Sequence, residues 1–483
     1  MKKPFATPLP GRRKIRAVLL LLLPQRRRGL GRGGRDYRNS YPLTPALSPL
    51  GRGEGVDCVF TQLLKLSTFF LFVFTVSLRA QDSVTSLAGQ ALVSGAANGT
   101  GTNALFSDPA AIVTDANGNF FVADSQNHAI RKITTNGVVT TFAGQFGVSG
   151  SLNGTGTNAQ FNTPSGLAFD TSGNLFVADT GNGTIRKITS AGGVSTFAGI
   201  AGSSGFADGM VGSAQFNSPL GIAVATNGGV FVADSGNHCI RRISGSVVST
   251  FAGSPQIWGS ADGTGTNAQF NGPVGLAFDT RGNLFVSDAN NDTIRKITAN
   301  GIVTTFAGAA GLDGSADGSV TAARFRSPAE LVFDQKGNLF VADSLNQVIR
   351  EITTNGVVST VSGATGISGS NDGTNGIGRF YNPYGLAIDA DGALFMTDTY
   401  NELVRAVLVP FKLSLQLSGA ARTVTISWDA VIGKKYQVQF RNDLSAAWSN
   451  LGSPAVATNL NLSATDNAAV ASPQRIYRVL LAP

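Results

Sequence analysis

One phrase recurs six times along this chain, and its clearest copy, Gly275–Ile297, reads GLAFDTRGNLFVSDANNDTIRKI. The arginine of the phrase returns at intervals of 55, 55, 54, 55 and 55 residues. A fixed period of this length indicates a repeat architecture, in which each copy forms one supersecondary unit.

Each copy contains four short runs rich in Val, Ile, Phe and Thr. In the fourth copy these runs are Leu276–Asp279, Leu284–Ser287, Thr293–Thr298 and Ile302–Ala307. Gly, Asn or Asp bounds each run, and these residues favour tight turns. Because no apolar run has a helical period, each copy is predicted to be a four-stranded antiparallel meander. A single meander can bury only one of its faces, so the six units must pack on one another. Packed radially, they form a β-propeller, which is an all-β fold.

The ends of the array predict how the propeller closes. The sixth copy has runs for three strands (Gly385–Asp389, Ala393–Thr397 and Leu403–Val409) but none for a fourth. A matching fourth-strand run, Val84–Gly89, precedes the first copy. We expect this N-terminal strand to complete the last blade, because it would pair an edge that is otherwise exposed.

The phrase NLFVAD…N..IRKI resembles the NHL-repeat propellers, and the resemblance covers about residues 82–410. Six blades are common in that family, so the resemblance implies a six-bladed propeller. It implies little about function, because propellers of this kind host unrelated activities.

Residues 1–57 form a basic leader of low complexity, and a translation start near Val59 would leave them untranslated. Residues 1–80 carry 15 Lys and Arg against 3 Asp and Glu, which leaves 22 basic and 26 acidic side chains, a net charge of −4, in residues 81–483. Nucleic-acid binding requires a basic patch on the folded domain, so we expect no nucleic-acid partner.

Residues 58–80 are predicted to be a signal peptide, with the apolar run Val59–Leu78 followed by Leu78-Arg79-Ala80 as the cleavage site. The alternative is an uncleaved N-terminal anchor, which would be the only contact with a membrane. Either reading predicts a secreted, periplasmic or cell-surface protein.

Residues 411–483 differ from the repeats and alternate apolar and polar residues in TVTISW and YQVQF. This alternation is typical of half-buried strands and predicts a small β-sandwich. The segments ISW, YQVQF and IYRVLL loosely resemble a short fibronectin type III module, which implies an adhesive or spacing role.

A triplet of the form Asp-x-x-Asn…Arg occurs in all six copies. Its members are Asp124, Asn127 and Arg131; Asp179, Asn182 and Arg186; Asp234, Asn237 and Arg241; Asp288, Asn291 and Arg295; Asp343, Asn346 and Arg350; Asp398, Asn401 and Arg405. Six identical sites in one ring argue for a structural role. We predict that Asp and Asn bond turn amides and that Arg pairs with a carboxylate across adjacent strands.

The long connections between copies also repeat two residues. An Asn or Asp precedes Gly in each (Asn98, Asn153, Asp208, Asp262, Asp317 and Asp372), and a Phe follows eight residues later (Phe106, Phe161, Phe216, Phe270, Phe325 and Phe380). The first residue is interpreted as an Asx turn and the Phe as a plug between blades. One carboxylate or amide per loop does not supply the six to eight oxygens of a calcium site, so no metal is expected.

Residues that depart from the repeat are the better candidates for a binding site. On the face that carries the long connections, the candidates are His128, His238, Trp258, Arg324, Arg326, Glu330, Tyr381 and Tyr384. The two histidines belong to the first and third copies, too far apart to share a zinc ion, and their default role is that of surface turn residues. Glu330 replaces the Gly that opens the innermost strand in four copies, which places it near the mouth of the central channel. It is expected to be solvated there. The alternative is a metal ligand, as in gluconolactonase-like propellers.

These observations favour an exported, monomeric and non-enzymatic propeller that binds a protein or a glycan through its loop face. No G-x-S-x-G, HExxH or P-loop pattern occurs, and His is nearly absent, so neither catalytic residues nor a cofactor are expected. Two alternatives remain open: a metal-dependent lactonase or lyase that uses the channel, and a structural spacer of the cell envelope. Cys239 is predicted to be a small buried residue and not a nucleophile.

Overall fold

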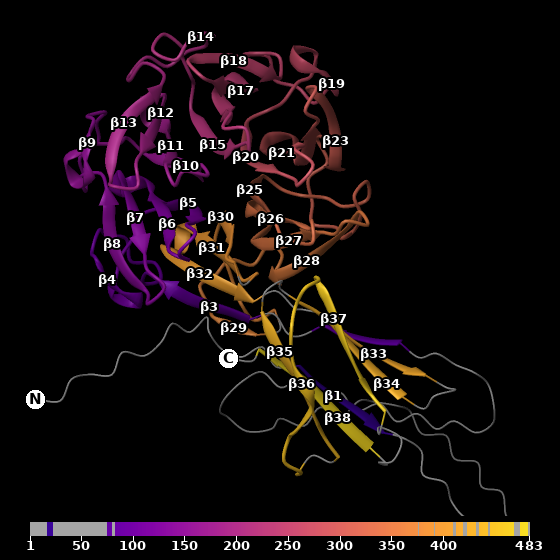
Figure 1. Cartoon of the computed structure of the whole chain (residues 1–483). Coiled ribbons are helices and arrows are strands. Elements are labelled where there is room, and N and C mark those ends of the chain that lie inside the picture. Colours follow the sequence, from indigo (N-terminus) through magenta and orange to yellow (C-terminus); the bar gives the residue numbers. More distant parts are fainter. Residues whose placement is uncertain are drawn as a thin grey trace, which may run out of the picture. The chain divides into compact units, whose positions relative to one another are not determined.

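The computed structural model describes residues 17–22, 75–79, 83–374, 376–390, 392–408, 412–418, 423–430, 434–442, 445–467 and 474–481 (Figure 1). The chain divides into two compact units, one containing Asp82–Pro410 and the other containing Phe411–Pro483. Most of the predicted leader and signal peptide lies outside the described residues, so both stay predictions. Within the described part of the chain, no helix has the length and apolarity needed to cross a bilayer.

The first unit is a six-bladed propeller, and each blade is an antiparallel sheet of five strands, not four. The fourth blade contains β19 (Gly263–Thr264), β20 (Pro273–Phe278), β21 (Leu284–Asp288), β22 (Thr293–Ile297) and β23 (Ile302–Gly308). The two-residue strand β19 comes from the long connection and pairs with β23 at the outer edge. This strand could not be predicted from the sequence, because two residues carry no periodicity.

The other blades repeat this order. The first contains β4 (Gly99–Thr100), β5 (Pro109–Thr114), β6 (Phe120–Asp124), β7 (Ala129–Ile133) and β8 (Val138–Ala143). The second contains β9 (Gly154–Thr155), β10 (Pro164–Phe169), β11 (Leu175–Asp179), β12 (Thr184–Ile188) and β13 (Gly193–Ala198). The third contains β14 (Gly209–Met210), β15 (Pro219–Val224), β16 (Val230–Asp234), β17 (Cys239–Ser244) and β18 (Val247–Ala252). The fifth contains β24 (Gly318–Ser319), β25 (Pro328–Phe333), β26 (Leu339–Asp343), β27 (Val348–Ile352) and β28 (Val357–Gly363).

Short 3₁₀ turns occur at two places in the repeat. Between the second and third strands they are η3 (Ser125–Asn127), η5 (Thr180–Asn182), η6 (Ser235–Asn237), η8 (Ala289–Asn291), η9 (Ser344–Asn346) and η10 (Thr399–Asn401). In the long connections they are η2 (Gly101–Asn103), η4 (Gly156–Asn158) and η7 (Gly265–Asn267).

The sixth blade combines strands from distant parts of the sequence. Its sheet runs β29 (Gly373–Thr374), β3 (Ser83–Ala88), β32 (Leu403–Leu408), β31 (Leu394–Asp398) and β30 (Pro383–Ile388). The strand β3 therefore occupies the fourth-strand position predicted for Val84–Gly89. Ser86 of β3 donates to Asp372 from its backbone N–H at 2.9 Å and its hydroxyl at 3.0 Å, which ties the strand to the long connection of this blade.

The six innermost strands (β5, β10, β15, β20, β25 and β30) surround the centre of the propeller (Figure 1). Glycine lets these strands approach one another closely. A Cβ added to Gly166 would lie 2.0 Å from the carbonyl oxygen of Leu220 in the next blade, and one added to Gly221 would lie 2.1 Å from that of Val274. The recurring Gly of the phrase is thus a packing requirement.

The hydrophobic core lies between neighbouring blades. One cluster joins Phe176 and Ile185 of the second blade to Ile222 and Val232 of the third, and Phe216 from the connecting loop is fully buried among them. The predicted role of the recurring Phe as a plug between blades agrees with this position.

The second unit consists of two four-stranded sheets that share one core. One sheet runs β1 (Ala17–Leu22), β38 (Gln474–Leu481), β35 (Lys435–Arg441) and β36 (Ser449–Val456); the other runs β2 (Thr75–Arg79), β33 (Lys412–Ser418), β34 (Thr423–Asp429) and β37 (Asn461–Asp466). Ile426 and Trp428 of one sheet pack with Val438 and Tyr477 of the other. Two edge strands come from leader segments, which the sequence analysis did not foresee. It also missed β36, which contains Gly and Pro and is mostly exposed. The likeness to fibronectin type III stays a prediction.

Candidate functional site

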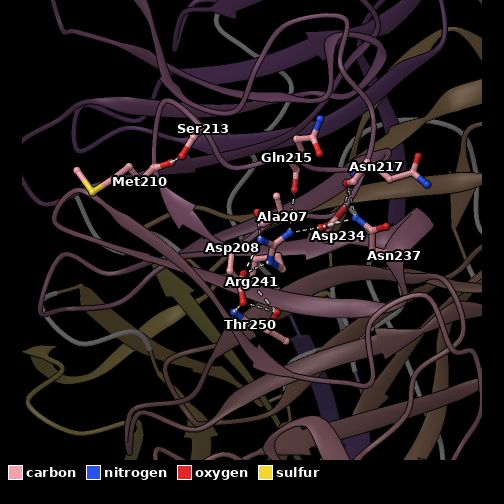
Figure 2. A network of polar contacts seen from close by, with 11 residues as sticks. Ala207, Asp208, Met210, Ser213, Gln215, Asn217, Asp234, Asn237, Arg241 and Thr250 are labelled. Carbon is pink, nitrogen blue, oxygen red and sulfur yellow. Dashed lines mark hydrogen bonds and ion pairs between the residues drawn. The ribbon is translucent and has the colours of Figure 1, made fainter.

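Each blade has a buried polar hub centred on the arginine of the phrase, and Figure 2 shows the hub of the third blade. Arg241 donates to Asp234 at 2.7 Å and to Asp208 at 2.6 Å, and its remaining N–H groups reach two loop carbonyls. Asp234 also accepts from the Asn237 side chain at 2.9 Å and from the Asn217 backbone N–H at 2.8 Å. Arg241 and Asp234 are fully buried. The hub therefore fixes the long connection to the blade and is closed to any substrate.

The same geometry recurs in all six blades. The buried Arg–Asp ion pair measures between 2.6 and 2.9 Å in each. Each arginine also lies over the recurring Phe, as Arg241 does at 5.1 Å from the ring centroid of Phe216. Burial raises the pKa of Asp234, while hydrogen bonds from Asn237 and Asn217 and the charge of Arg241 oppose that rise.

The recurring Asn or Asp of the long connection has a different role from the predicted Asx turn. Asn98 accepts from Arg131 at 2.9 Å, and Asp262 accepts from Arg295 at 2.8 Å. The residue is thus part of the hub, which a local reading could not show because the two partners are 33 residues apart.

A second repeated contact joins each blade to the next. The residue after the second-to-third turn has positive φ in every blade: His128, Gly183, His238, Asp292, Gln347 and Glu402. Five of these side chains accept a hydrogen bond from the backbone N–H of the residue before the first-strand proline of the following blade, at 2.7 to 3.1 Å. We call these five residues the junction acceptors. The sixth position, Gly183, has no side chain, so the contact between the second and third blades lacks this bond.

The two histidines lie on turns and are half-buried there, and the structure gives them a further role as junction acceptors. Nδ1 of His128 accepts from Thr163 and Nδ1 of His238 accepts from Gly272, both at 3.1 Å. Each ring must be neutral, with its proton on Nε2, because the N–H of an imidazolium cannot accept. Burial lowers the pKa of both histidines, which favours this neutral form.

The junction between the sixth and first blades brings two carboxyl groups together. Glu402 accepts from the backbone N–H of Asp108 at 2.7 Å, although the two residues are 294 positions apart. Burial and, to a smaller extent, the charges of Asp108 and Asp124 raise the pKa of Glu402 to about 7, against the hydrogen bond from the Asp108 backbone. Thr399 adds a hydroxyl bond to the carbonyl of Pro109 at 2.8 Å.

Glu330 lies near the start of its innermost strand, as predicted, but it is partly buried and not freely solvated. Burial raises its pKa to about 7, against hydrogen bonds from the backbone of Leu331 and Leu276. The neighbouring Tyr384 of the sixth blade is partly buried, and its pKa is raised by burial and by the charge of Glu330. The innermost strands of the fifth and sixth blades thus bring one carboxyl group beside one phenol.

These residues do not fit the metal site that the lactonase alternative requires. Among the described residues, no three His, Cys, Asp or Glu side chains are grouped so that they could hold a metal ion. Glu330 lacks the Asn and Asp partners that such a site needs. No metal-dependent step can be derived from this arrangement.

The loop face is defined by the second-to-third turns, because Asp124 before one turn lies opposite Pro109 at the start of the first strand. Beside these turns lie six tip turns: 90–93, 145–148, 200–203, 254–257, 309–312 and 364–367. Bonds such as that from Leu92 N–H to the Asn401 carbonyl, at 2.9 Å, attach the tip turns to the second-to-third turns.

The loop face exposes many large apolar side chains. Of the nineteen exposed in the described residues, eleven lie on or beside these turns: Leu92, Val93, Val148, Ile200, Ile257, Trp258, Leu312, Leu345, Ile367, Tyr381 and Tyr400. Trp258, predicted as a binding residue, is 68% exposed. Exposed apolar side chains that gather on one face are a feature of interaction sites.

The predicted arginines and tyrosines divide into two groups. Arg324 donates to carbonyls of its own loop at 2.8 to 3.1 Å, so it supports that loop. Arg326 is exposed and pairs with Asp313 at 3.3 Å. Tyr381 is 40% exposed and contacts Tyr400, which is 49% exposed. The sequence analysis missed Tyr400, although its position within the phrase, which holds Gly181 and Gly236 in other copies, was the available signal.

Cys239 is buried, as predicted, and burial raises the pKa of its thiol. A thiol of this kind is a poor nucleophile because so little of it is ionised.

Comparison with known proteins agrees with this architecture. The NHL repeat family model matches residues 161–188 and 216–243, in the second and third blades. Protein SUPPRESSOR OF QUENCHING 1, chloroplastic, of Arabidopsis thaliana is 29% identical over 53% of this chain and 26% of its own length. NHL repeat-containing protein 2 of Homo sapiens is 28% identical over 65% of this chain and 47% of its own length. The chain thus spans less than half the length of these relatives.

Among solved structures, an auxiliary nutrient binding protein from Bacteroides thetaiotaomicron aligns with a TM-score of 0.53 at 15% identity, covering 68% of this chain and 77% of that one. This likeness concerns the fold alone. Taken with the six repeated blades and the matched segments, it shows a β-propeller whose second and third blades match the NHL repeat model.

Proposed function

We propose that this chain is an exported, non-enzymatic binding protein that holds a protein or glycan partner on the loop face of its propeller. One observation carries the proposal: the large exposed apolar side chains concentrate on the turns of this face. The opposite hairpins, between the third and fourth strands, expose Val138, Val247, Ile302 and Val357, and the exposed Met210 is paired with Val247 beside one of them.

The repeat divides this surface into two parts. The hubs and the core are alike in all blades, and the fourth residue of the tip turn is apolar in five of them, whereas the residue that follows the tip turn differs in kind between blades. Trp258 follows one tip turn, and Ser204 and Ser368 occupy the same position in others. A rigid scaffold with variable loops is the usual design of a binding surface. The related fold of an auxiliary nutrient binding protein shows that this architecture can serve binding.

Two double variants of the full chain test the proposal. Trp258→Ser with Leu312→Ser removes apolar surface from the loop face, where these residues are 68% and 56% exposed. Val247→Ser with Ile302→Ser is the matched control on the opposite hairpins, at 47% and 45% exposure. Both variants should fold, because exposed substitutions usually change stability by only about 0.5 kcal/mol.

The readout is co-sedimentation of each purified chain with the cell-envelope fraction of the source organism. We expect the unchanged chain and the control variant to co-sediment, and the loop-face variant to bind about tenfold more weakly. Equal binding by both variants, or no binding by the unchanged chain, would contradict the proposal.

A further inference from the structure

The exposed tyrosine pair of the sixth blade differs from the residues at the same positions of the other blades, and the propeller fold does not require it. At the two positions of Tyr381 and Tyr400, the second blade carries Asn162 and Gly181 and folds into the same geometry. The pair therefore adds something that the propeller fold itself does not require.

The backbone of the pair is fixed by the hub beneath it. The backbone N–H of Tyr381 donates to Asp398 at 2.7 Å, and Asp398 is paired with the buried Arg405 at 2.6 Å. The backbone N–H of Tyr400 donates to the carbonyl of Tyr381 at 3.1 Å. The ring centroids lie 5.1 Å apart with the planes at 81°. A ligand would thus meet a preformed corner of two aromatic rings, with little ordering cost on binding.

The surroundings of this corner are polar. The residue after Tyr381, Asn382, is fixed by its backbone N–H to the side chain of Gln347 at 2.7 Å. One blade earlier, the equivalent two positions hold Arg326, which forms an exposed ion pair with Asp313, and Leu345. Aromatic surface and hydrogen-bonding groups therefore follow one another along the loop face across the fifth and sixth blades.

We infer that the Tyr381–Tyr400 corner binds a neutral carbohydrate, an inference that rests on the proposed binding function and names its ligand class. A pyranose ring has C–H groups on its faces and hydroxyl groups around its rim. The C–H face suits an aromatic ring, and the rim suits phenol and amide groups. A longer oligosaccharide would extend from the corner toward Leu345 and Arg326.

Charge argues against an anionic ligand. Arg326 has Asp313 as an ion-pair partner, and residues 81–483 carry 22 basic and 26 acidic side chains. A nucleic acid or an acidic polysaccharide would need unpaired cations on this face. A protein partner also uses exposed tyrosines, and it would leave the chain unretarded by polysaccharide but still able to co-sediment with the envelope.

The test is affinity electrophoresis of the full chain through native gels that contain xylan, mannan or mixed-linkage β-glucan. The corner is removed by Tyr381→Asn with Tyr400→Gly, which installs the residues that the second blade carries at these positions. Asn271→Ala with Asn290→Ala changes the same two positions in the fourth blade and is the matched control.

We expect at least one polysaccharide to retard the unchanged chain and the control, and the corner variant to bind about tenfold more weakly. If a polysaccharide retards the corner variant as strongly as the unchanged chain, the corner is not the site. If none retards the unchanged chain but it still co-sediments with the envelope through Trp258 and Leu312, the carbohydrate assignment is overturned and loop-face binding stands. If both assays are negative, both proposals fail.

Discussion

The hubs and the corners of this propeller lie on the same turns, but the residues of the hub repeat in every blade and those of the corner do not. Every hub has a buried arginine paired with a buried aspartate, from Arg131 with Asp124 to Arg405 with Asp398. The two positions equivalent to Tyr381 and Tyr400, which we call the corner of each blade, hold different residues in most blades, and only the sixth blade carries two tyrosines there. The comparison indicates that the invariant layer holds the fold, whereas the variable layer is available for recognition and for tuning the contacts between blades.

The largest effect should follow from breaking a hub. Arg295→Leu leaves Asp288 buried and unpaired, and a broken buried ion pair costs about 3–5 kcal/mol. Lys296→Leu is the control, because this neighbouring side chain is only partly buried over Phe285. Urea denaturation should show a large loss of stability for the first variant and little change for the second. Equal losses would contradict the structural role of the hub.

A smaller effect, on the pH dependence of stability, should distinguish the two blade contacts whose junction acceptor is a histidine from the other contacts. The pKa values of His128 and His238 are lowered in the folded state from about 6.5. Their contribution to stability is therefore present above pH 6.5 and is lost as the pH falls through the folded-state values. Each lost acceptor bond should cost about 1 kcal/mol.

Replacing both histidines by Gln isolates this effect, because Gln347 already serves as a junction acceptor in the fifth blade. We expect His128→Gln with His238→Gln to leave the melting temperature at pH 7.5 nearly unchanged and to reduce its fall between pH 7 and pH 5. The same acid dependence in the double variant and the unchanged chain would exclude the histidines as its cause.

The junction between the sixth and first blades should show the opposite pH dependence. The pKa of Glu402 is raised to about 7, so its contribution is fully present below the unfolded value of 4.5 and is lost as the pH rises through 7. Glu402→Gln keeps an acceptor for the N–H of Asp108 and removes the charge. We expect this variant to melt slightly higher than the unchanged chain at pH 8 and at the same temperature at pH 5. A lower melting temperature at pH 8 would contradict this account.

The smallest effect on stability should come from the corner. Tyr381 and Tyr400 are exposed and absent from the other blades, so their exchange for Asn and Gly should change the free energy of unfolding by about 0.5 kcal/mol or less. Thermal melting checks this expectation, with the Asn271→Ala, Asn290→Ala variant as the reference. A large destabilisation would mean that the pair serves the fold.

Much of the fold could be predicted, because the repeat period and the turn residues can be read directly along the sequence. The interval between arginines predicted six blades, and the orphan run at Val84 predicted the strand that β3 supplies to the sixth blade. The two-residue outer strands could not be predicted, because a pair such as Gly263 and Thr264 contains no pattern to detect.

The junction acceptors were missed for a different reason. The bond from Asp108 to Glu402 exists only once the sixth blade has met the first, and the bond from Thr163 to His128 depends on a positive φ at His128. Sequence position alone shows His, Asp, Gln and Glu as unrelated residues. The shared backbone geometry makes them equivalent acceptors.

The most direct test of the division between hubs and corners is one thermal-melting series on the full chain, comparing Arg295→Leu with Tyr381→Asn, Tyr400→Gly. The account predicts a melting temperature several degrees lower for the hub variant and an unchanged one for the corner variant. A hub variant that melts like the unchanged chain, or a corner variant that melts as low as the hub variant, would contradict it.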